Sequence, residues 1–454
     1  MASPIEWSIH EDARRSFDAR AEQLASRLRH PREEELPSKP TYQPDVHIAA
    51  ALSEEHVADM GLLDPGGNPI ARSFLASNGA EIGLFGDDHR EFIRLVESIQ
   101  RTETLRRHVS RAFLSHVAFE WIRARHAGDA AMPLMNTVLQ RCRASVRSMQ
   151  VWVPIADLHV LADLPFGRVR FSSIARSQFD QTIAFVRERG ERETQDVTTE
   201  LRGIERRRRE YQGRAAVVVD VVAESQHARD LAVDLAQEAV DYLRVFHPSH
   251  LYLRPACHLD VWGATPVRTA ACLIYGHQIW EETLEEQTDV PTRPLVCDRE
   301  YVAILNDLGL ASIGDLLTRN QQAPFVTLLL GALRRYSRSV LALAEDERLL
   351  RVIVALETML LADSSEAIQQ NIADRLAYYL ETDGPSRRAV VDDVKRAYGV
   401  RSRYVHHGQG MDEITQLERF LEIAWRFFLK VIKDADKYQD KVSFIQALDE
   451  IKYA

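Results

Sequence analysis

A stretch near the C-terminus combines cationic side chains with side chains that can transfer a proton. It reads YGVRSRYVHHGQG, from Tyr398 to Gly410, and no acidic residue occurs between Lys395 and Asp412. Arginine is a permanent cation whose planar fork matches phosphate oxygens, and histidine gains or loses a proton near neutral pH. The stretch therefore indicates either an anion site at which a proton moves, or a basic helix end without chemistry.

Helical geometry limits how these side chains can act together. At about 100° per residue, Arg403 and His407 share one helix face, whereas Arg401 and His406 diverge by about 140°. One straight helix does not direct Arg401 and His406 at the same small target. They converge only if the helix starts or ends inside the motif, or if a second copy of the chain supplies the partner. The glycines that follow favour a helix end.

The composition indicates a soluble, globular protein of more than one domain. Its 454 residues are 45% hydrophobic and 27% charged, and the usual domain size predicts two or three domains. The formal net charge of -10 excludes a general nucleic-acid coat, so any nucleic-acid contact must be local. We expect a cytoplasmic protein, because the sequence has no recognisable signal peptide or membrane-spanning apolar run.

The sequence lacks the motifs that several classes of cofactor and metal site require. The chain contains neither GxxxxGKS/T nor GxGxxG, and Lys39 is its only lysine before Lys395, which disfavours P-loop and pyridoxal enzymes. Its four cysteines form no CxxC pair, and the adjacent Cys257 and His258 have no partners at ligand spacing. We therefore expect no cofactor and no metal ion.

Periodicity and breaker residues divide the chain into regions. Residues 1–45 read as a charged helix and a proline-containing arm, 46–150 as mainly helical, and 151–300 as a mixed α/β sensor or scaffold domain. Residues 315–454 read as a helical bundle, whose third helix we expect to be capped at Ser364 and Ser365. The predicted fold class is α+β multidomain, with helical and mixed α/β regions preceding an all-α bundle.

The mixed region combines strands with a very charged helix. Strands are predicted at 151–160 and around Val169 and Phe171, and the β-branched run at 214–225 is typical of a buried strand. A further strand is predicted at 251–263. The charged helix, predicted at 179–213, carries a run from Arg206 to Arg209 that is either a phosphate-binding patch or, given the many acids beside it, a solvated face.

The segment AYGVRSRYVHHG resembles the R-x4-6-H motif of HEPN domains, and in particular the Apea-like branch, where an aromatic residue precedes R-S-x-x-V/I-H-G. Arg401, Ser402 and His406 match this pattern, while His407 stands where the branch usually has glycine. Upstream, IVALETML and SEAIQQNIADRLAYYL resemble two helices of the same family. The resemblance covers about residues 315–450.

The resemblance implies a four- or five-helix bundle that dimerises so that two motifs meet, and a metal-independent endoribonuclease that leaves a 2′,3′-cyclic phosphate. It assigns catalysis to Arg401, His406 and His407, substrate binding to Ser402, Arg403 and Tyr404, and a supporting role to Glu357. Tyr404 could stack on a base or pack in the bundle. Glu357 could orient the arginine or lie on the helix surface.

The expected partners are single-stranded RNA or tRNA and a second copy of the chain. An activator or antitoxin is a further possible partner, and the sequence does not identify it. A toxin or anti-phage defence role follows from the resemblance. Two alternatives stay open: a non-catalytic HEPN module for dimerisation or RNA binding, and a ligand-sensing protein acting through residues 150–290.

Overall fold

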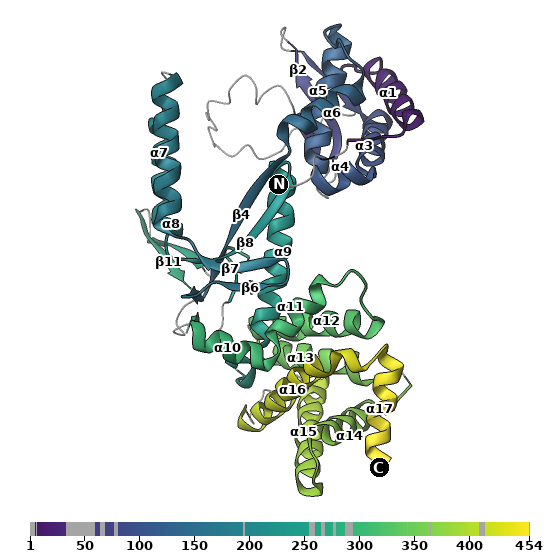
Figure 1. The fold of residues 1–454 in the computed structure, drawn as a ribbon, viewed down its shortest axis with the longest axis vertical. Coiled ribbons are helices and arrows are strands. Elements are labelled where there is room, and N and C mark those ends of the chain that lie inside the picture. The colour runs from purple at the N-terminus through teal and green to yellow at the C-terminus, as the bar shows by residue number, and fades with distance from the viewer. Residues whose placement is uncertain are drawn as a thin grey trace. The chain divides into compact units, whose positions relative to one another are not determined.

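The chain forms two compact units, seen in the computed structural model in Figure 1. The first unit comprises residues 1–149 and 221–231, and the second comprises residues 150–220 and 232–454. The structure describes residues 5, 7–32, 60–63, 69–76, 80–193, 196–253, 259–264, 268–275, 278–286, 294–342, 344–363, 365–407 and 414–453.

In its described part, the first unit packs helices against a three-stranded antiparallel sheet of order β1-β2-β3. Its elements are α1 (Glu11–Ala25), β1 (Met60–Leu63), β2 (Pro69–Leu75), β3 (Glu81–Phe85), α3 (Gly86–Gln100), α4 (Glu103–His108), α5 (Arg111–Ala127) and α6 (Leu134–Ser145). Helices were predicted over most of this region, but the three strands were not. The proline-containing arm lies outside the described residues.

Local signals bound the central helix of this unit. The Ser110 side chain accepts a hydrogen bond from the Phe113 amide at the start of α5, and Gly128 ends the helix in the left-handed region, with φ 88°. Phe92 and Phe119 lie in the buried core that α3 and α5 share.

The second unit contains a curled five-stranded sheet of order β6-β7-β8-β4-β9. Its strands and those beside it are β4 (Arg147–Ala156), β5 (Leu158–Val160), β6 (Leu164–Phe166), β7 (Val169–Ser173), β8 (Ala215–Ala223), β9 (Asp260–Val261), β10 (Arg268–Tyr275), β11 (Gln278–Glu286) and β12 (Leu295–Cys297). The strand predicted around Val169 and Phe171 is confirmed as β7, where both residues are buried, and the buried strand predicted at 214–225 is confirmed as β8. Of the strand predicted at 251–263, residues 254–258 lie outside the described part of the chain; the described part contains β9 and the end of a 3-10 turn, η2 (Pro248–Leu251).

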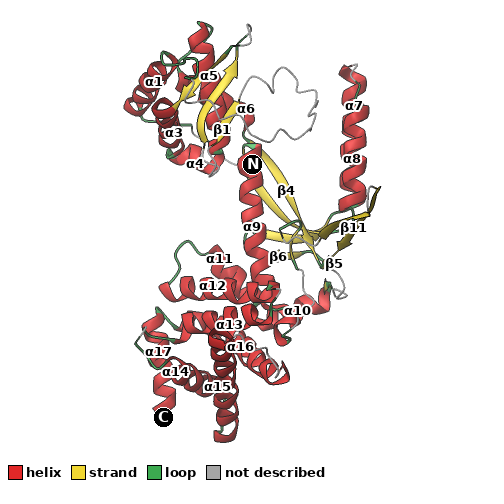
Figure 2. Cartoon of the chain, turned by 180° about the vertical axis from the view of Figure 1, so that it is seen from behind, coloured by secondary structure: helices red, strands yellow, loops and turns green. Residues whose placement is uncertain are grey.

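The charged segment predicted as a single helix forms two. These are α7 (Arg176–Glu193) and α8 (Thr198–Tyr211), which pack on each other through Ile183, Val186 and Ile204. Helix α9 (Ser225–Val245) follows β8 and continues into the second unit. Figure 2 shows the strands beside the α7–α8 arm and the helices that follow them.

Helices make up the remainder of the second unit. They are α10 (Arg299–Leu308), α11 (Leu310–Thr318), α12 (Pro324–Ser337), η3 (Arg338–Leu341), α13 (Glu345–Leu360), α14 (Ile368–Leu380), α15 (Gly384–His407), α16 (Ile414–Asp434), η4 (Ala435–Lys437) and α17 (Lys441–Tyr453). Helix α14 packs along α15 and against α17, and α13 packs against α12, α14 and α15. A mixed α/β part followed by a helical bundle agrees with the predicted fold class at this level.

Aromatic and ionic contacts hold the bundle together. Tyr379 and Phe444 meet edge to face, with ring centroids 6.0 Å apart, and join α14 to α17. The buried Arg375 donates to Glu366 and to Asp449, and also to the carbonyl of Leu360 at the end of α13. These contacts fix α13, α14 and α17 as a frame for α15.

No single helix in the described part of the chain is long and apolar enough to cross a membrane. Helices α10 and α11 would meet the length and composition requirement only when taken together, and they are bent by 67° at their junction.

Candidate functional site

The arginine–histidine motif lies on one unbroken helix. Helix α15 runs from Gly384 to His407 and therefore contains Arg401 and His406. Of the two ways in which the residues could converge, a helix end between Arg401 and His406 is not found, because α15 continues through both. Their positions around the helix differ by about 140°, so a convergent site needs a group from elsewhere.

The predicted site residues fall into described and undescribed side chains. Arg401 is half-buried and Ser402 is exposed on α15, and Glu357 lies on α13. The side chains of four other predicted residues lie outside the described part of the chain, although their backbone belongs to α15: Arg403, Tyr404, His406 and His407.

Glu357 lies beside the arginine. Its Oε1 is 3.7 Å from an Nη of Arg401, and the same oxygen accepts a hydrogen bond from the Tyr398 hydroxyl at 3.1 Å. The Glu357 side chain is 20% exposed and that of Arg401 is 35% exposed, so bulk solvent only partly screens their attraction. Of the two interpretations of Glu357, the arginine-orienting one has the contact that it requires.

Packing between α13 and α15 creates this cluster. Leu356, Met359 and Leu360 bury one side of α13, while Tyr398 is 7% exposed on α15. Burial, and after it the charge of Glu357, raises the pKa of the Tyr398 phenol, so the tyrosine stays a neutral donor. Sequence reasoning did not single out Tyr398, although it precedes Arg401 by three residues and so lies on the same side of the helix.

The guanidinium of Arg401 keeps unused donor capacity. At 3.7 Å its contact with Glu357 is an ion pair rather than a hydrogen bond, and its Nε is shielded from solvent with no hydrogen-bond partner among the described residues. A shielded N–H without a partner is unfavourable. An anion such as a phosphate could accept hydrogen bonds from the Nη groups, whereas the shielded Nε is closed to it.

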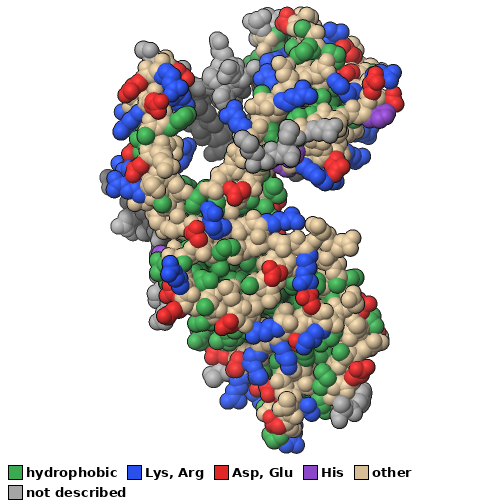
Figure 3. Space-filling model, in the orientation of Figure 1, with side chains coloured by type: hydrophobic (Ala, Val, Ile, Leu, Met, Phe, Trp, Pro, Cys, Tyr) green, Lys and Arg blue, Asp and Glu red, His purple; other side chains and the backbone are tan. Residues whose placement is uncertain are grey.

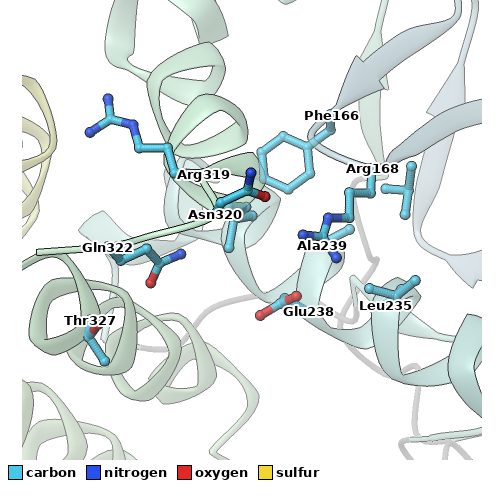
Figure 4. Close-up of a pocket in the computed structure, with 11 residues that line it drawn as sticks. Phe166, Arg168, Leu235, Glu238, Ala239, Arg319, Asn320, Gln322 and Thr327 are labelled. Atoms are coloured by element: carbon cyan, nitrogen blue, oxygen red, sulfur yellow. The ribbon is translucent and has the colours of Figure 1, made fainter. Parts of the chain in front are cut away.

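A separate cavity of about 470 Å³ lies within the second unit, between the β6–β7 turn, α9, and the segment that joins α11 to α12. Figure 4 shows the guanidinium of Arg168 and the carboxylate of Glu238 on one side of it, with the Asn320 amide near the Phe166 ring. The Arg319 guanidinium turns away and pairs with Asp436. This cavity could hold a small polar molecule.

Metal ligation finds no support in the part of the chain that the structure describes, which contains no group of three or more His, Cys, Asp or Glu placed to hold an ion. The pair Cys257 and His258 lies outside the described residues. Cys142 and Cys297 are buried free thiols, and burial raises the pKa of each to about 12.

Comparisons with family models, with curated proteins and with solved structures give no match to this chain.

Proposed function

We propose that the C-terminal bundle is a HEPN-like, metal-independent endoribonuclease that acts as a homodimer. The observation that supports it is the state of Arg401: the charge of Glu357 holds it, but it donates no hydrogen bond within the described part of the chain. A permanent cation with free donors, placed on the same helix as two histidines, suits the phosphodiester of RNA.

The chemistry needs one proton acceptor, one proton donor and one charge stabiliser. A histidine, His406 or His407, takes the proton of a ribose 2′-OH, and that oxygen attacks the adjacent phosphorus. The bond to the 5′-oxygen breaks, and the leaving oxygen receives a proton from a second group. Arg401 stabilises the charge that develops on the phosphoryl oxygens, and the product ends in a 2′,3′-cyclic phosphate. Exposed Ser402, with Arg403 and Tyr404, would contact the flanking substrate.

The geometry of α15 makes a dimeric site the simplest arrangement. Arg401 and His406 diverge around one helix, and a second copy of the chain would supply a histidine opposite each arginine. A two-fold interface places the same surface of both copies in contact and would bring two motifs together.

Cleavage of labelled single-stranded RNA and tRNA in EDTA tests the activity. Wild type should cleave and leave a 2′,3′-cyclic phosphate, while Arg401→Ala and His406→Ala should each lower the rate by at least about 100-fold. His407→Ala shows which histidine is the base. Arg396→Ala is the matched control, because Arg396 lies on the same helix at similar exposure and is already bonded to Asp393. Cleavage that persists in Arg401→Ala would refute the proposal.

Mixed dimers test where the site is assembled. Arg401→Ala and His406→Ala chains, co-expressed with different tags and purified through both tags in turn, should regain about half of the wild-type rate, because every heterodimer carries one intact composite site of two. A site built within one chain would give no recovery. No cleavage by any form of the protein, together with RNA binding that Arg401→Ala weakens, would favour the non-catalytic module instead.

In the cell, we propose that this RNA cleavage serves as a toxin or in anti-phage defence. Expression of wild type in a bacterial host should arrest growth, and Arg401→Ala should not. Equal toxicity of the two proteins would separate any growth effect from RNA cleavage.

The cavity at Arg168 supports a second candidate function, the sensing of a small ligand through the α/β part of the second unit. Nucleoside monophosphates are suitable probes, since Arg168 could bind a phosphate and the amide of Asn320 a base. Ligand binding should raise the melting temperature of wild type but not of Arg168→Ala. Equal shifts in both proteins would exclude this cavity.

A further inference from the structure

A groove of about 580 Å³ lies between the sheet and the helical arm of the second unit. The lining comprises Gln150, Trp152 and Pro154 of β4, Phe179 and Gln181 of α7, and Tyr211 at the end of α8. The volume is within the range of about 300–1,000 Å³ that is typical of ligand sites. Aromatic rings and amides dominate its lining, which distinguishes it from the cavity at Arg168.

Hydrogen bonds hold the Trp152 indole in a fixed orientation. Its Nε1 donates to Oε1 of Gln150 at 2.9 Å, and Nε2 of Gln150 donates to Asp220 at 3.0 Å. Both functions of the Gln150 amide are therefore used. Gln181 has no hydrogen-bond partner among the described residues and can present its amide to a ligand. A fixed aromatic face next to a free amide suits a flat ring with polar edges.

Cationic side chains stand at the tyrosine end of the groove. Arg207 precedes Tyr211 by one helical turn on α8 and is exposed. The guanidinium of Arg214 lies over Trp262, 3.7 Å from the ring centroid, and the Trp262 amide donates to the Pro154 carbonyl at 2.9 Å. Nε of Arg214 also donates to the carbonyl of Glu210, the residue before Tyr211, so Arg214 lies at the tyrosine end of the groove.

The acids around the groove are largely engaged. Asp180 pairs with Arg176 and Arg208, and Asp220 accepts the hydrogen bond from Gln150. At the tyrosine end, the single negative charge of Glu210 stands against the two positive charges of Arg207 and Arg214. Figure 3 shows acidic and basic side chains mixed over the α7–α8 arm, so the attraction for an anion is local rather than spread along the arm.

We propose that this groove binds an unpaired nucleic-acid strand, with one or two bases against Trp152 and Tyr211 and the flanking phosphates on Arg207 and Arg214. Base–aromatic stacking with arginine on the backbone is the usual way in which proteins hold single strands. A duplex would not fit, because its bases are stacked on each other and closed to a protein ring. That the strand is RNA rests on the proposed function; binding at the groove does not require cleavage.

The test is fluorescence anisotropy with a short fluorescein-labelled oligouridylate. The full chain carries Arg401→Ala, so that the probe is not consumed. Trp152→Ala should weaken binding by about 5- to 150-fold. Arg207→Gln should lower the slope of log Kd against log salt by about 0.7, the value for one phosphate contact on a single strand. Arg202→Gln is the matched control, since Arg202 is exposed on the same helix but turned about 140° from Arg207.

Two results would overturn the proposal: affinities of Trp152→Ala and Arg207→Gln equal to that of the parent, or binding of an RNA duplex as tight as that of the single strand. Equal binding of single-stranded DNA supports the same site, because bases and phosphates are common to both strands. If Trp152→Ala does not fold by thermal unfolding, Gln181→Ala and Arg207→Gln decide the question.

The groove and the proposed ribonuclease can fail separately. Loss of strand binding in the groove variants without any cleavage by wild type would support the groove and refute the enzyme. Cleavage by wild type, together with unchanged binding in the groove variants, would support the enzyme and refute the groove.

Discussion

The carboxylate of Glu357 on α13 lies 3.7 Å from the guanidinium of Arg401 on α15. The same oxygen receives the Tyr398 hydroxyl at 3.1 Å, so the carboxylate is itself held in place. This arrangement sets the direction of the arginine, and no described residue accepts a hydrogen bond from its guanidinium. A positioning role of this kind predicts a different kinetic effect from a role in binding the substrate.

Replacing Glu357 by glutamine should therefore impair turnover more than binding. Gln keeps an oxygen for the Tyr398 hydroxyl but removes the charge that holds Arg401. If the bundle is the proposed ribonuclease, kcat for RNA cleavage should fall by about 10- to 100-fold, because a small misplacement of a catalytic group is costly. KM should be unchanged or lower, since Arg401 then attracts phosphate without a competing carboxylate. Steady-state cleavage of a labelled RNA gives both constants.

Glu347→Gln is the matched control for this prediction. Glu347 lies on the same helix and pairs with Arg351 at 2.6 Å in an exposed position, so its loss should leave both constants as in wild type. An increase in KM at constant kcat in Glu357→Gln would contradict the positioning role.

The sequence could indicate Arg401, Ser402 and Glu357, because side-chain chemistry and a short motif are local properties. It could not reveal Tyr398 as the partner of Glu357, since that contact depends on how α13 packs against α15. Nor could it separate the interpretations of Glu357, which differ only in tertiary contacts.

The strands of the first unit were missed because burial along strand β2 does not alternate. Ala71, Ser73 and Phe74 are buried, so both faces of the strand carry a buried residue, while Ile70 is 43% exposed and Leu75 is 39% exposed. Ser73 is tolerated there because it donates to Glu81, and Gly83 on the neighbouring strand leaves room for it. A period-two search looks for apolar residues on the buried face and cannot detect such a strand.

Local capping explains two further differences in helix boundaries. The α7–α8 break coincides with Asp196, whose carboxylate accepts from the Thr198 amide and favours a turn. The cap expected at Ser364 and Ser365 is wrong, because α14 begins at Ile368 and Ser365 bonds instead to Asp363. In both places an aspartate side chain accepts a local hydrogen bond that favours a turn over a helix. The periodicity of apolar residues carries no information about such a hydrogen bond.

Arg375→Ala should strongly destabilise the bundle. The arginine is 6% exposed, and its removal leaves Glu366 and Asp449 without their cation and the Leu360 carbonyl without its donor. We expect the free energy of unfolding to fall by about 3–5 kcal/mol, measured by urea denaturation. Arg319→Ala is the control, because its pair with Asp436 is exposed and should contribute less than about 1 kcal/mol. Equal effects of the two substitutions would contradict the burial argument.

Two glycines of the second unit should respond in opposite directions to alanine. Gly309, between α10 and α11, has φ 117°, and a Cβ there would approach Cγ2 of Ile432 to 2.8 Å. Gly309→Ala should lower the free energy of unfolding by about 1–3 kcal/mol. Gly331 lies inside α12 with open space at its Cβ position, so Gly331→Ala should raise the free energy of unfolding by about 0.5–1 kcal/mol. Parallel urea titrations measure both, and the same sign in both would contradict the prediction.

His89 should make the first unit less stable as the solution becomes acidic. The imidazole is 2% exposed, and burial, followed by the charges of Arg72 and Arg90, lowers its pKa to about 4. An unfolded histidine has a pKa of about 6.5, so between these values the unfolded chain binds a proton that the folded chain does not. The contribution of His89 to the free energy of unfolding is complete above about pH 6.5 and is lost at up to about 1.4 kcal/mol per pH unit as the pH falls toward 4.

The denaturation midpoint should therefore decrease with falling pH across this range, and His89→Gln should reduce that decrease. The resonance that disappears in the NMR spectrum of His89→Gln identifies the imidazole, and in wild type it should not titrate above about pH 5. A titration of that resonance near pH 6.5 would contradict the prediction.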